Sequence, residues 1–368
     1  MRISSNVVNL VRGTASAFDA SMMQDDGSVI VRLEKALYGL RQSGRVWYDL
    51  LSSKLEGLGY VRSDIDRCIF TKIDGASTTH IAVYVDDLLV VGNDSKARSD
   101  LMDALRSEFK EISIQSEDEM SFVGLEILTD KDKNVKVRQL GYIKDVLEHF
   151  KIAEGDFQDH PCSANIMDQP KAGDKSFDKS TFLSGVMKLM YLSTRSRPDI
   201  AFAVSALACR SSDPKESDWN SLIRIAKFLN KTRDDYLVFK HGGEIKLSAY
   251  VDASFMRHRD KRGHTGYAIF ADSIGSAGVV YRSVKQTTVA NSSTEAEVIA
   301  LHDLVQHLLW VQGIYDSLGV KYDKPSVIHD DNEATIKLNS SPIVNFSGRS
   351  KYIAPSTSPC TNISRTEK

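Results

Sequence analysis

The stretch from Ile81 to Val91 reads IAVYVDDLLVV, and the two carboxylates at its centre decide how the surrounding chain is interpreted. One apolar run precedes Asp86 and Asp87, and another follows them. Two apolar runs around a short polar break predict a β-hairpin with an acidic tip. Aspartates are common at exposed turns, and paired carboxylates also bind Mg²⁺ for phosphoryl transfer. The hairpin alone leaves both interpretations open.

The composition is that of a globular protein with two or three domains. The chain has 368 residues, of which 42% are hydrophobic and 26% are charged, as is usual for soluble domains. Its formal net charge is -2, so any nucleic acid must be bound by local basic clusters. Four cysteines without metal-ligand spacing, no signal peptide and no long apolar run predict a cytoplasmic or nuclear protein that is neither secreted nor membrane-bound.

The chain divides where the pattern of apolar and polar residues changes. Residues 43–60 carry leucines at helical spacing, which predicts a helix. Residues 153–180 are polar and contain two prolines, so we expect a linker there, followed by helical patterns up to residue 232. Strand patterns begin at residue 245. The last stretch, 354–368, is rich in Ser, Thr and Pro, and we expect it to be disordered.

A second set of carboxylates lies beyond residue 244. Residues 245–252 alternate apolar and polar side chains, which predicts a strand that carries Asp252 at its end. The stretch 292–295, Ser-Ser-Thr-Glu, has the spacing of a capping box, so a long helix is predicted to begin there. Glu297 shares a stripe of this helix with leucines. Asp331 follows another apolar run, at a predicted strand end.

Several motifs occur in one order along the chain. The segment 33–43, LEKALYGLRQS, precedes Tyr84-Val85-Asp86-Asp87, and FVGLEI at 122–127 follows it. Together they resemble the reverse transcriptase of copia-type long-terminal-repeat retrotransposons, and the likeness covers about residues 25–353. The resemblance implies a partial palm and thumb in 1–152, a linker and helical connection in 153–242 and a ribonuclease H-like domain in 243–353. The expected fold is therefore an α+β palm and thumb followed by an α/β ribonuclease H-like domain.

In the polymerase part, the resemblance implies roles for individual residues. Asp86 and Asp87 would be catalytic metal ligands, and Gly39 and Ser43 would lie beside the template and the incoming nucleotide. Two basic residues, Lys35 and Arg45, would face phosphates. The family needs a further Asp on an earlier strand, and no aspartate before residue 33 follows an apolar strand. The expectation is that this chain alone does not polymerise DNA.

In the last domain, the order of strand Asp, helix Glu and strand-end Asp resembles the ribonuclease H fold. The resemblance makes Asp252, Glu297 and Asp331 catalytic ligands of Mg²⁺ or Mn²⁺ that hydrolyse the RNA strand of an RNA–DNA hybrid by two-metal catalysis. The likeness ends after Ile353, which implies that the last carboxylate of the site is missing. The nucleic-acid-binding residues expected around this site are Arg257, Arg259 and Arg262. The alternative is a non-catalytic nucleic-acid-binding remnant of a decayed element.

Overall fold

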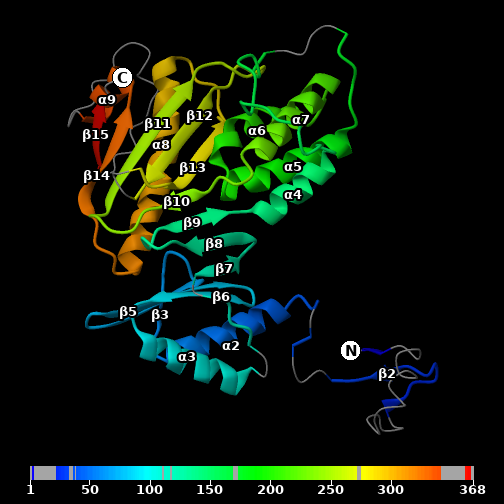
Figure 1. Cartoon of the computed structure of the whole chain (residues 1–368), viewed down its shortest axis with the longest axis vertical. Helices are drawn as coiled ribbons and strands as arrows, with labels where there is room; N and C mark the ends of the chain where they lie inside the picture. Colours follow the sequence, from blue (N-terminus) through cyan, green and yellow to red (C-terminus); the bar gives the residue numbers. More distant parts are fainter. Residues whose placement is uncertain are drawn as a thin grey trace. The chain divides into compact units, whose positions relative to one another are not determined.

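The computed structural model describes a mixed α+β protein with two compact units (Figure 1). It describes residues 2–3, 22–32, 36–37, 39–109, 112–116, 118–168, 173–271, 275–340 and 361–365. One unit comprises Met1–Arg62, Cys68–Asp86 and Val90–Lys110, and the other comprises Ser63–Arg67, Asp87–Leu89 and Glu111–Lys368. No helix among the described residues is long and apolar enough to cross a membrane.

The first 110 residues supply a four-stranded sheet of order β3-β4-β5-β6, and β1 and β2 form a separate pair. The predicted acidic hairpin is confirmed, because β5 ends at Tyr84 and β6 begins at Asp87. The predicted helix at 43–60 is also confirmed. The side chain of Asp94 accepts hydrogen bonds from the backbone of Lys96 and Ala97, which fixes where α3 begins. The elements are β1 (Arg2–Ile3), β2 (Val29–Ile30), α2 (Ser43–Gly57), β3 (Val61–Arg62), β4 (Ile69–Asp74), β5 (Ser77–Tyr84), β6 (Asp87–Gly92) and α3 (Ser95–Glu108).

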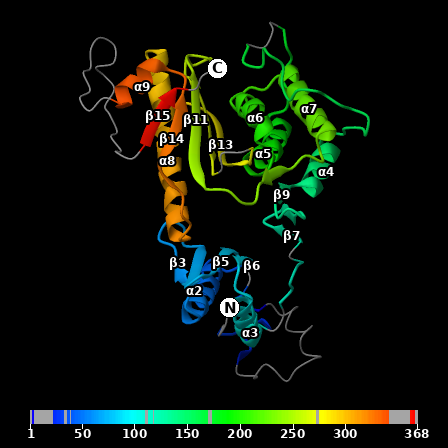
Figure 2. The same ribbon diagram turned by 60° about the vertical axis from the view of Figure 1, so that its left-hand side comes forward.

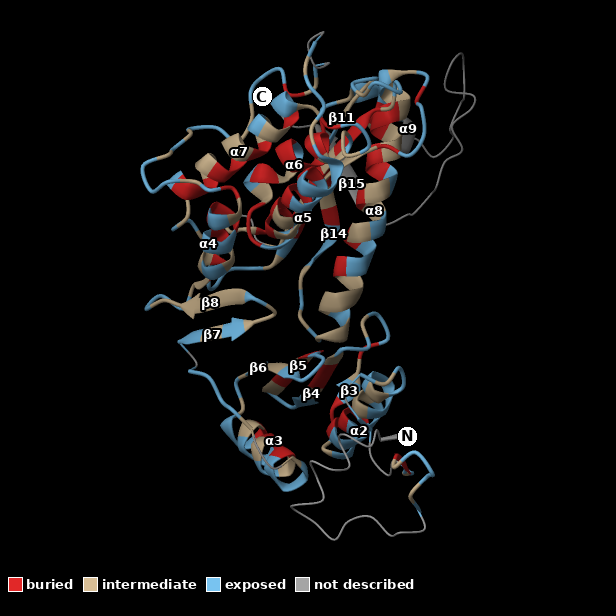
Figure 3. Cartoon of the chain, turned by 90° about the vertical axis from the view of Figure 1, so that its right-hand side faces the viewer, coloured by how far each residue is buried: buried red, intermediate tan, exposed pale blue. Residues whose placement is uncertain are grey.

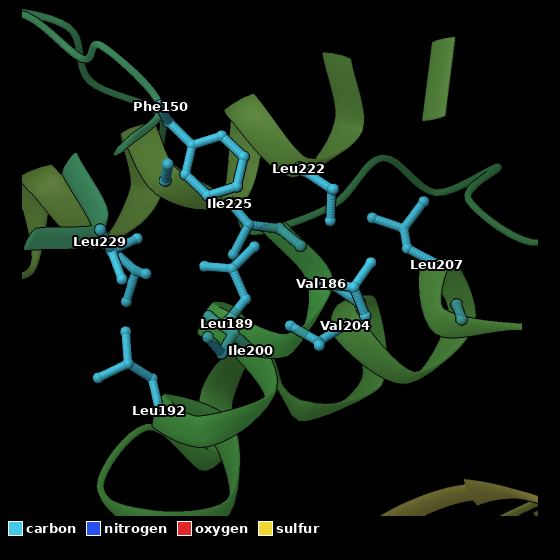
Figure 4. Packing of buried hydrophobic residues seen from close by; sticks show 14 of the residues in the cluster. Phe150, Val186, Leu189, Leu192, Ile200, Val204, Leu207, Leu222, Ile225 and Leu229 are labelled. Carbon is cyan, nitrogen blue, oxygen red and sulfur yellow. The ribbon is translucent and has the colours of Figure 1, made fainter. Parts of the chain in front are cut away.

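A helical layer and a small sheet follow. The sheet has the order β10-β9-β8-β7, all antiparallel, and the helices bury one continuous apolar cluster. Figure 4 shows side chains of this cluster from α5, α6 and α7, together with Phe150 just after α4, pointing toward one another. The elements are β7 (Glu119–Phe122), β8 (Leu125–Thr129), β9 (Val135–Arg138), α4 (Leu140–His149), α5 (Lys179–Arg195), the 3-10 turn η2 (Pro198–Ile200), α6 (Ala201–Ala208), α7 (Glu216–Lys231) and β10 (Leu237–Phe239).

The domain boundary expected at residue 152 does not match this core. Ile143 and Val146 of α4 are buried in the same cluster as Leu189 of α5 and Leu222 of α7. Because an apolar helix face is buried against its nearest partner, α4 packs with α5 and α7 in one core. The polar linker remains between α4 and α5, although Ile166 within it is buried against the cluster.

Leu189→Ala should destabilise this core by about 2–5 kcal/mol, because Leu189 is fully buried in the cluster and its truncation leaves a cavity. Leu183 lies on the same helix and is 48% exposed, so Leu183→Ala is the matched control and should change stability by less than about 0.5 kcal/mol. Urea unfolding followed by circular dichroism measures both. Equal transitions for the two variants would contradict the core assignment.

A five-stranded sheet with the order β13-β12-β11-β14-β15 forms the last part of the chain. Strand β11 is antiparallel to β12 and parallel to β14, and the long helix α8 lies along β11 (Figures 1 and 2). The helix buries leucines against the sheet, and Figure 3 shows buried residues at intervals along it. The elements are β11 (Lys246–Ser254), β12 (His264–Phe270), β13 (Gly278–Lys285), α8 (Ser293–Ser317), β14 (Asp323–Asp330), α9 (Glu333–Ser340) and β15 (Thr361–Arg365).

The tail expected to be disordered at 354–368 is corrected at one place. Residues Thr361–Arg365 form β15, which pairs in parallel with β14 from Ser326↔Thr361 to Asp330↔Arg365. The Ser-, Thr- and Pro-rich composition predicted no regular structure here. Without β15, however, β14 would be the edge strand of the sheet, and its backbone groups would be open to pairing. A short segment of almost any sequence can pair with such an edge through its backbone.

Candidate metal centre and basic surfaces

Asp252 is presented at the end of β11. The buried side chains of this strand are Leu247, Ala249 and Val251, and they face the core under α8. Asp252 follows Val251, on the alternate position of the strand, and is exposed. Because successive side chains of a strand point to opposite faces, the pattern that buries the leucine and valine also leaves this carboxylate accessible.

Glu297 lies in the second turn of α8, and the local sequence fixes its position. The hydroxyl of Ser292 accepts a hydrogen bond from the Glu295 backbone at 3.1 Å, and the Glu295 carboxylate accepts one from the Asn291 backbone at 2.7 Å. The predicted capping interaction is therefore confirmed, and the helix begins at Ser293, four residues before Glu297. Glu297 is only 5% exposed.

The carboxylate of Glu297 is in an unfavourable environment. It accepts a hydrogen bond from the backbone of Ala253, but its Oε2 atom is buried and has no hydrogen-bond partner among the described residues. Burial first, and then the negative charges of Asp330, Asp252 and Asp331, raise the pKa of Glu297 from 4.5 to about 8. A buried carboxylate without a counter-charge is costly, so this arrangement favours a bound cation.

Two adjacent aspartates end β14, and they lie in different environments. Asp330 is fully buried, and its Oδ1 accepts a hydrogen bond from the Asn332 backbone at 2.8 Å. Within the described part of the chain its Oδ2 has no hydrogen-bond partner, and burial raises the pKa of Asp330. Asp331 is exposed. Asn332 begins α9, because its side chain accepts hydrogen bonds from the backbones of Ala334 and Thr335 at 3.0 and 3.1 Å.

Three of the predicted ligands come together. One carboxylate oxygen from each of Asp252, Glu297 and Asp331 lies within 4.8 Å of the other two. Hard divalent cations such as Mg²⁺ take oxygen ligands of this kind. Oε2 of Glu297, which has no hydrogen-bond partner among the described residues, is such an oxygen. The residues therefore fit a divalent cation. Asp330 was not predicted as part of this site; its position one residue before Asp331 was the only signal.

The hairpin carboxylates do not form a comparable group. Asp86 and Asp87 are exposed at the turn between β5 and β6, and among the described residues no third metal-binding side chain joins them. The turn itself is held in place, because the indole N–H of Trp47 donates to the carbonyl of Val85 at 2.7 Å. Val85 has a positive φ of 54°, which is unusual for a β-branched residue.

The predicted template-binding residues surround the start of α2. Gly39 has a φ of 89°, a conformation that suits glycine, and Ser43 donates its hydroxyl to the carbonyl of Leu37 at 2.5 Å. Arg45 forms an exposed ion pair with Asp49 at 2.7 Å, so its charge is already partnered within the helix. Lys35 lies outside the described residues.

The predicted arginines of the β11–β12 loop are not equivalent. Arg262 pairs with Asp260 at 3.5 Å. Arg257 and Arg259 are exposed, and neither forms an ion pair within 4.0 Å among the described residues. The structure therefore leaves two of the three predicted guanidinium groups available to an anion.

Comparison with known proteins identifies the class of the chain. A family model described as reverse transcriptase (RNA-dependent DNA polymerase) matches residues 18–164, which include the acidic hairpin. The retrovirus-related Pol polyprotein from transposon RE2 of Arabidopsis thaliana is 31% identical over 337 residues, or 90% of this chain and 22% of the relative. The corresponding polyprotein from transposon TNT 1-94 of Nicotiana tabacum is 28% identical over 334 residues, 88% of this chain and 24% of the relative.

These matches define a reverse transcriptase region. The chain belongs to the copia-type retrotransposon Pol polyprotein family, which confirms the resemblance seen in its motifs. It spans less than a quarter of the length of these two relatives. A solved structure of the foamy viral protease-reverse transcriptase in complex with RNA/DNA hybrid aligns with 87% of this chain and 36% of that chain, with a TM-score of 0.47 and 13% sequence identity.

Proposed function

We propose that the last domain of this chain is a ribonuclease H that hydrolyses the RNA strand of RNA–DNA hybrids. The observation that carries the proposal is the convergence of Asp252, Glu297 and Asp331 within 4.8 Å. They come from a strand, a helix and a second strand end, in the order that the ribonuclease H resemblance predicts. Asp86 and Asp87 remain candidate ligands of the polymerase part.

The three carboxylates would hold Mg²⁺ or Mn²⁺. When bound, the cation supplies Lewis-acid stabilisation of the phosphate oxygens and lowers the pKa of water. The chain's own contribution is to fix the ligands. Asp252 is held by a strand paired on both sides, and Glu297 is held by its hydrogen bond from Ala253 and by the packed helix α8. Rigid placement of the ligands lets them bind without reorganisation.

The partner is a nucleic acid that carries phosphates. An RNA–DNA hybrid is the substrate of the proposed hydrolysis, and a template–primer duplex is the corresponding partner of the reverse transcriptase region. The net charge of -2 means that attraction must come from local cationic groups rather than from the whole molecule. Arg257 and Arg259 are such groups, because both are exposed and neither has an ion pair with the residues that the structure describes.

Cleavage of a labelled RNA–DNA hybrid tests the proposal. The wild-type protein should release RNA fragments with Mg²⁺ or Mn²⁺, should release none in a chelator, and should leave a DNA duplex of the same sequence intact because that duplex lacks the 2′-hydroxyl. Asp252→Asn should lower the rate by at least about 100-fold, because the loss of one charged ligand removes stabilisation of charge in the transition state. Cleavage that persists unchanged in Asp252→Asn would reject the triad as the site.

The second candidate is a domain that binds hybrids without cutting them. The observation in its favour is the exposure of Arg257 and Arg259, neither of which has an ion pair among the described residues. These two side chains can hold phosphates whether or not the triad is active. The same assay separates the two candidates when binding is measured beside cleavage. Hybrid binding without metal-dependent cleavage would favour this second candidate.

A further inference from the structure

A cavity of about 210 Å³ lies between the turn after α6 and the β11–β12 loop. Its basic lining residues are Arg210, Arg257, Arg259 and Lys285, and its acidic ones are Asp213 and Asp260. Pockets that enclose a whole small molecule measure roughly 300–1,000 Å³, so this one fits a single group of a larger ligand. The excess of basic side chains selects an anionic group.

The charges of the pocket are not equally available. Asp260 pairs with Lys285 at 3.0 Å, and Asp213 pairs with Lys215 at 2.9 Å. Arg210 pairs with the buried Asp218 at 2.5 Å. Asp260 and Asp213 thus each have a lysine partner, although the charge of Arg259 also acts on Asp213. Arg257 and Arg259 remain as the two lining cations with no ion pair within 4.0 Å in the described parts of the chain.

The two walls of the pocket are held by internal bonds. On one wall, the ring of His258 bonds to that of His264 at 3.0 Å, and His264 bonds to Ser283 at 2.8 Å. The same loop is closed by a backbone hydrogen bond from His258 to Arg262 at 3.1 Å. On the other wall, Arg210 also donates to the carbonyls of Ile166 and Asp168. A pocket that is formed before binding loses little conformational freedom when its ligand enters.

We propose that this pocket binds a phosphate group of the nucleic-acid backbone, with Arg257 and Arg259 as its contacts. Guanidinium groups bind phosphate oxygens in a planar, two-pronged geometry. The proposal rests on the proposed function, since it places the hybrid on the same sheet that carries Asp252. Arg257 follows Asp252 by five residues, so at most about 18 Å of chain separates the two. One hybrid can therefore reach both.

Binding measured without metal tests the pocket independently of cleavage. The probe is a fluorescent RNA–DNA hybrid, titrated at several salt concentrations with the wild-type protein and with Arg257→Gln/Arg259→Gln. We expect the double variant to bind about tenfold more weakly, with a salt dependence shallower by about two counterions, because two phosphate contacts are lost. Ser212→Glu, which adds a negative charge to the pocket lining and leaves both arginines in place, should weaken binding to a similar extent.

The matched control removes two charges elsewhere. Lys131 and Lys133 are exposed on the β8–β9 turn with the same spacing as the two arginines, and Lys131→Gln/Lys133→Gln should leave the affinity within about twofold. Equal weakening by this control and by the arginine variant would overturn the pocket. Unchanged hybrid affinity in the arginine variant would also overturn it. Binding of inorganic phosphate and of a ribonucleoside monophosphate is measured separately. If the arginine substitutions weaken the binding of these small ligands but not of the hybrid, the assignment of the pocket to a polynucleotide is overturned.

The two proposals can fail separately. Pocket-dependent binding by a protein that never cleaves the hybrid would support the pocket and reject the hydrolysis. Cleavage that depends on Asp252 but is indifferent to the arginine substitutions would support the hydrolysis and reject the pocket. In the case where both hold, Arg257→Gln/Arg259→Gln should raise the KM for the hybrid and leave kcat unchanged, since lost binding that is equal in ground and transition states appears in KM.

Discussion

Glu297→Gln should make the protein more stable in a chelator and remove most of the stabilisation that Mn²⁺ provides. The wild-type carboxylate is buried, has a partnerless Oε2 and is repelled by Asp330, Asp252 and Asp331. A neutral amide removes that repulsion while keeping the shape of the side chain. The same substitution removes a charged ligand, so the added cation should bind the variant weakly.

The pH dependence of this effect has a definite sign. The pKa of Glu297 is about 8 in the folded protein, above its ordinary value of 4.5, so ionisation opposes folding. Below about pH 4.5 the side chain is protonated in both states and costs nothing. The destabilisation grows as the pH rises from there toward 8, and it levels off above. The advantage of Glu297→Gln in a chelator should therefore be larger at about pH 8.5 than at about pH 5.5.

Melting temperatures with and without Mn²⁺ measure both effects. Wild-type protein should gain stability with Mn²⁺ as the ratio of free ion to Kd rises, by about 2.7 kcal/mol at a hundredfold ratio. Glu244 is an exposed glutamate on a loop, and Glu244→Gln should behave like the wild type in both respects. A Glu297→Gln protein that is less stable in a chelator, or that responds fully to Mn²⁺, would contradict the proposed ligand role.

The sequence predicted the strand of Asp252 and the helix of Glu297 because their signals are local, whereas the grouping of these residues with Asp331 came from the ribonuclease H resemblance. Alternation along residues 245–252 exposes Asp252 at a strand end, and the cap at Ser292 sets the start of the helix that buries Glu297. These patterns depend on neighbours within a few residues. They also predicted the acidic hairpin around Asp86, which the structure confirms.

What the sequence could not predict depends on the folded conformation of one loop and on distant residues. The pairing of Arg262 with Asp260 and the freedom of Arg257 follow from the folded loop, and a count of basic residues does not distinguish them. The pocket needs Arg210, far away in the chain, to lie against the same loop. The strand at Thr361–Arg365 depends on backbone pairing with the distant strand β14.

The burial of Asp330 is the clearest case of such a distant cause. Alternation places Asp330 on the face of β14 that carries Ser326 and Ile328. That face packs against α8, because Gln312 of the helix donates to Ser326 at 2.8 Å and Ile328 lies in the core with Leu304. Alternation along β14 separates Asp330 from Asp331, but only the packing of α8 decides which of the two is buried. Their roles should therefore differ in a way that substitution can reveal.

Asp331→Asn should reduce hybrid cleavage by at least about 100-fold at any Mn²⁺ concentration, because it removes a ligand of the proposed centre. Asp330→Asn should act more mildly. Its Oδ1 can still accept from the Asn332 backbone, and only a neighbouring charge is lost, which typically costs about tenfold in metal affinity. Saturating Mn²⁺ should then restore the rate of Asp330→Asn and leave Asp331→Asn inactive.

Cleavage rates over a titration of Mn²⁺ measure this difference, and hybrid binding in a chelator checks that both variants are folded. The comparison is informative because the two side chains are adjacent and chemically identical, so a general effect of lost charge in this region would appear equally in both. The opposite result would be a cleavage rate that Mn²⁺ restores in Asp331→Asn and does not restore in Asp330→Asn. That result would mean that the roles assigned to the two aspartates are reversed. The buried carboxylate would then be the ligand, and the exposed one would only add to the negative field around Glu297.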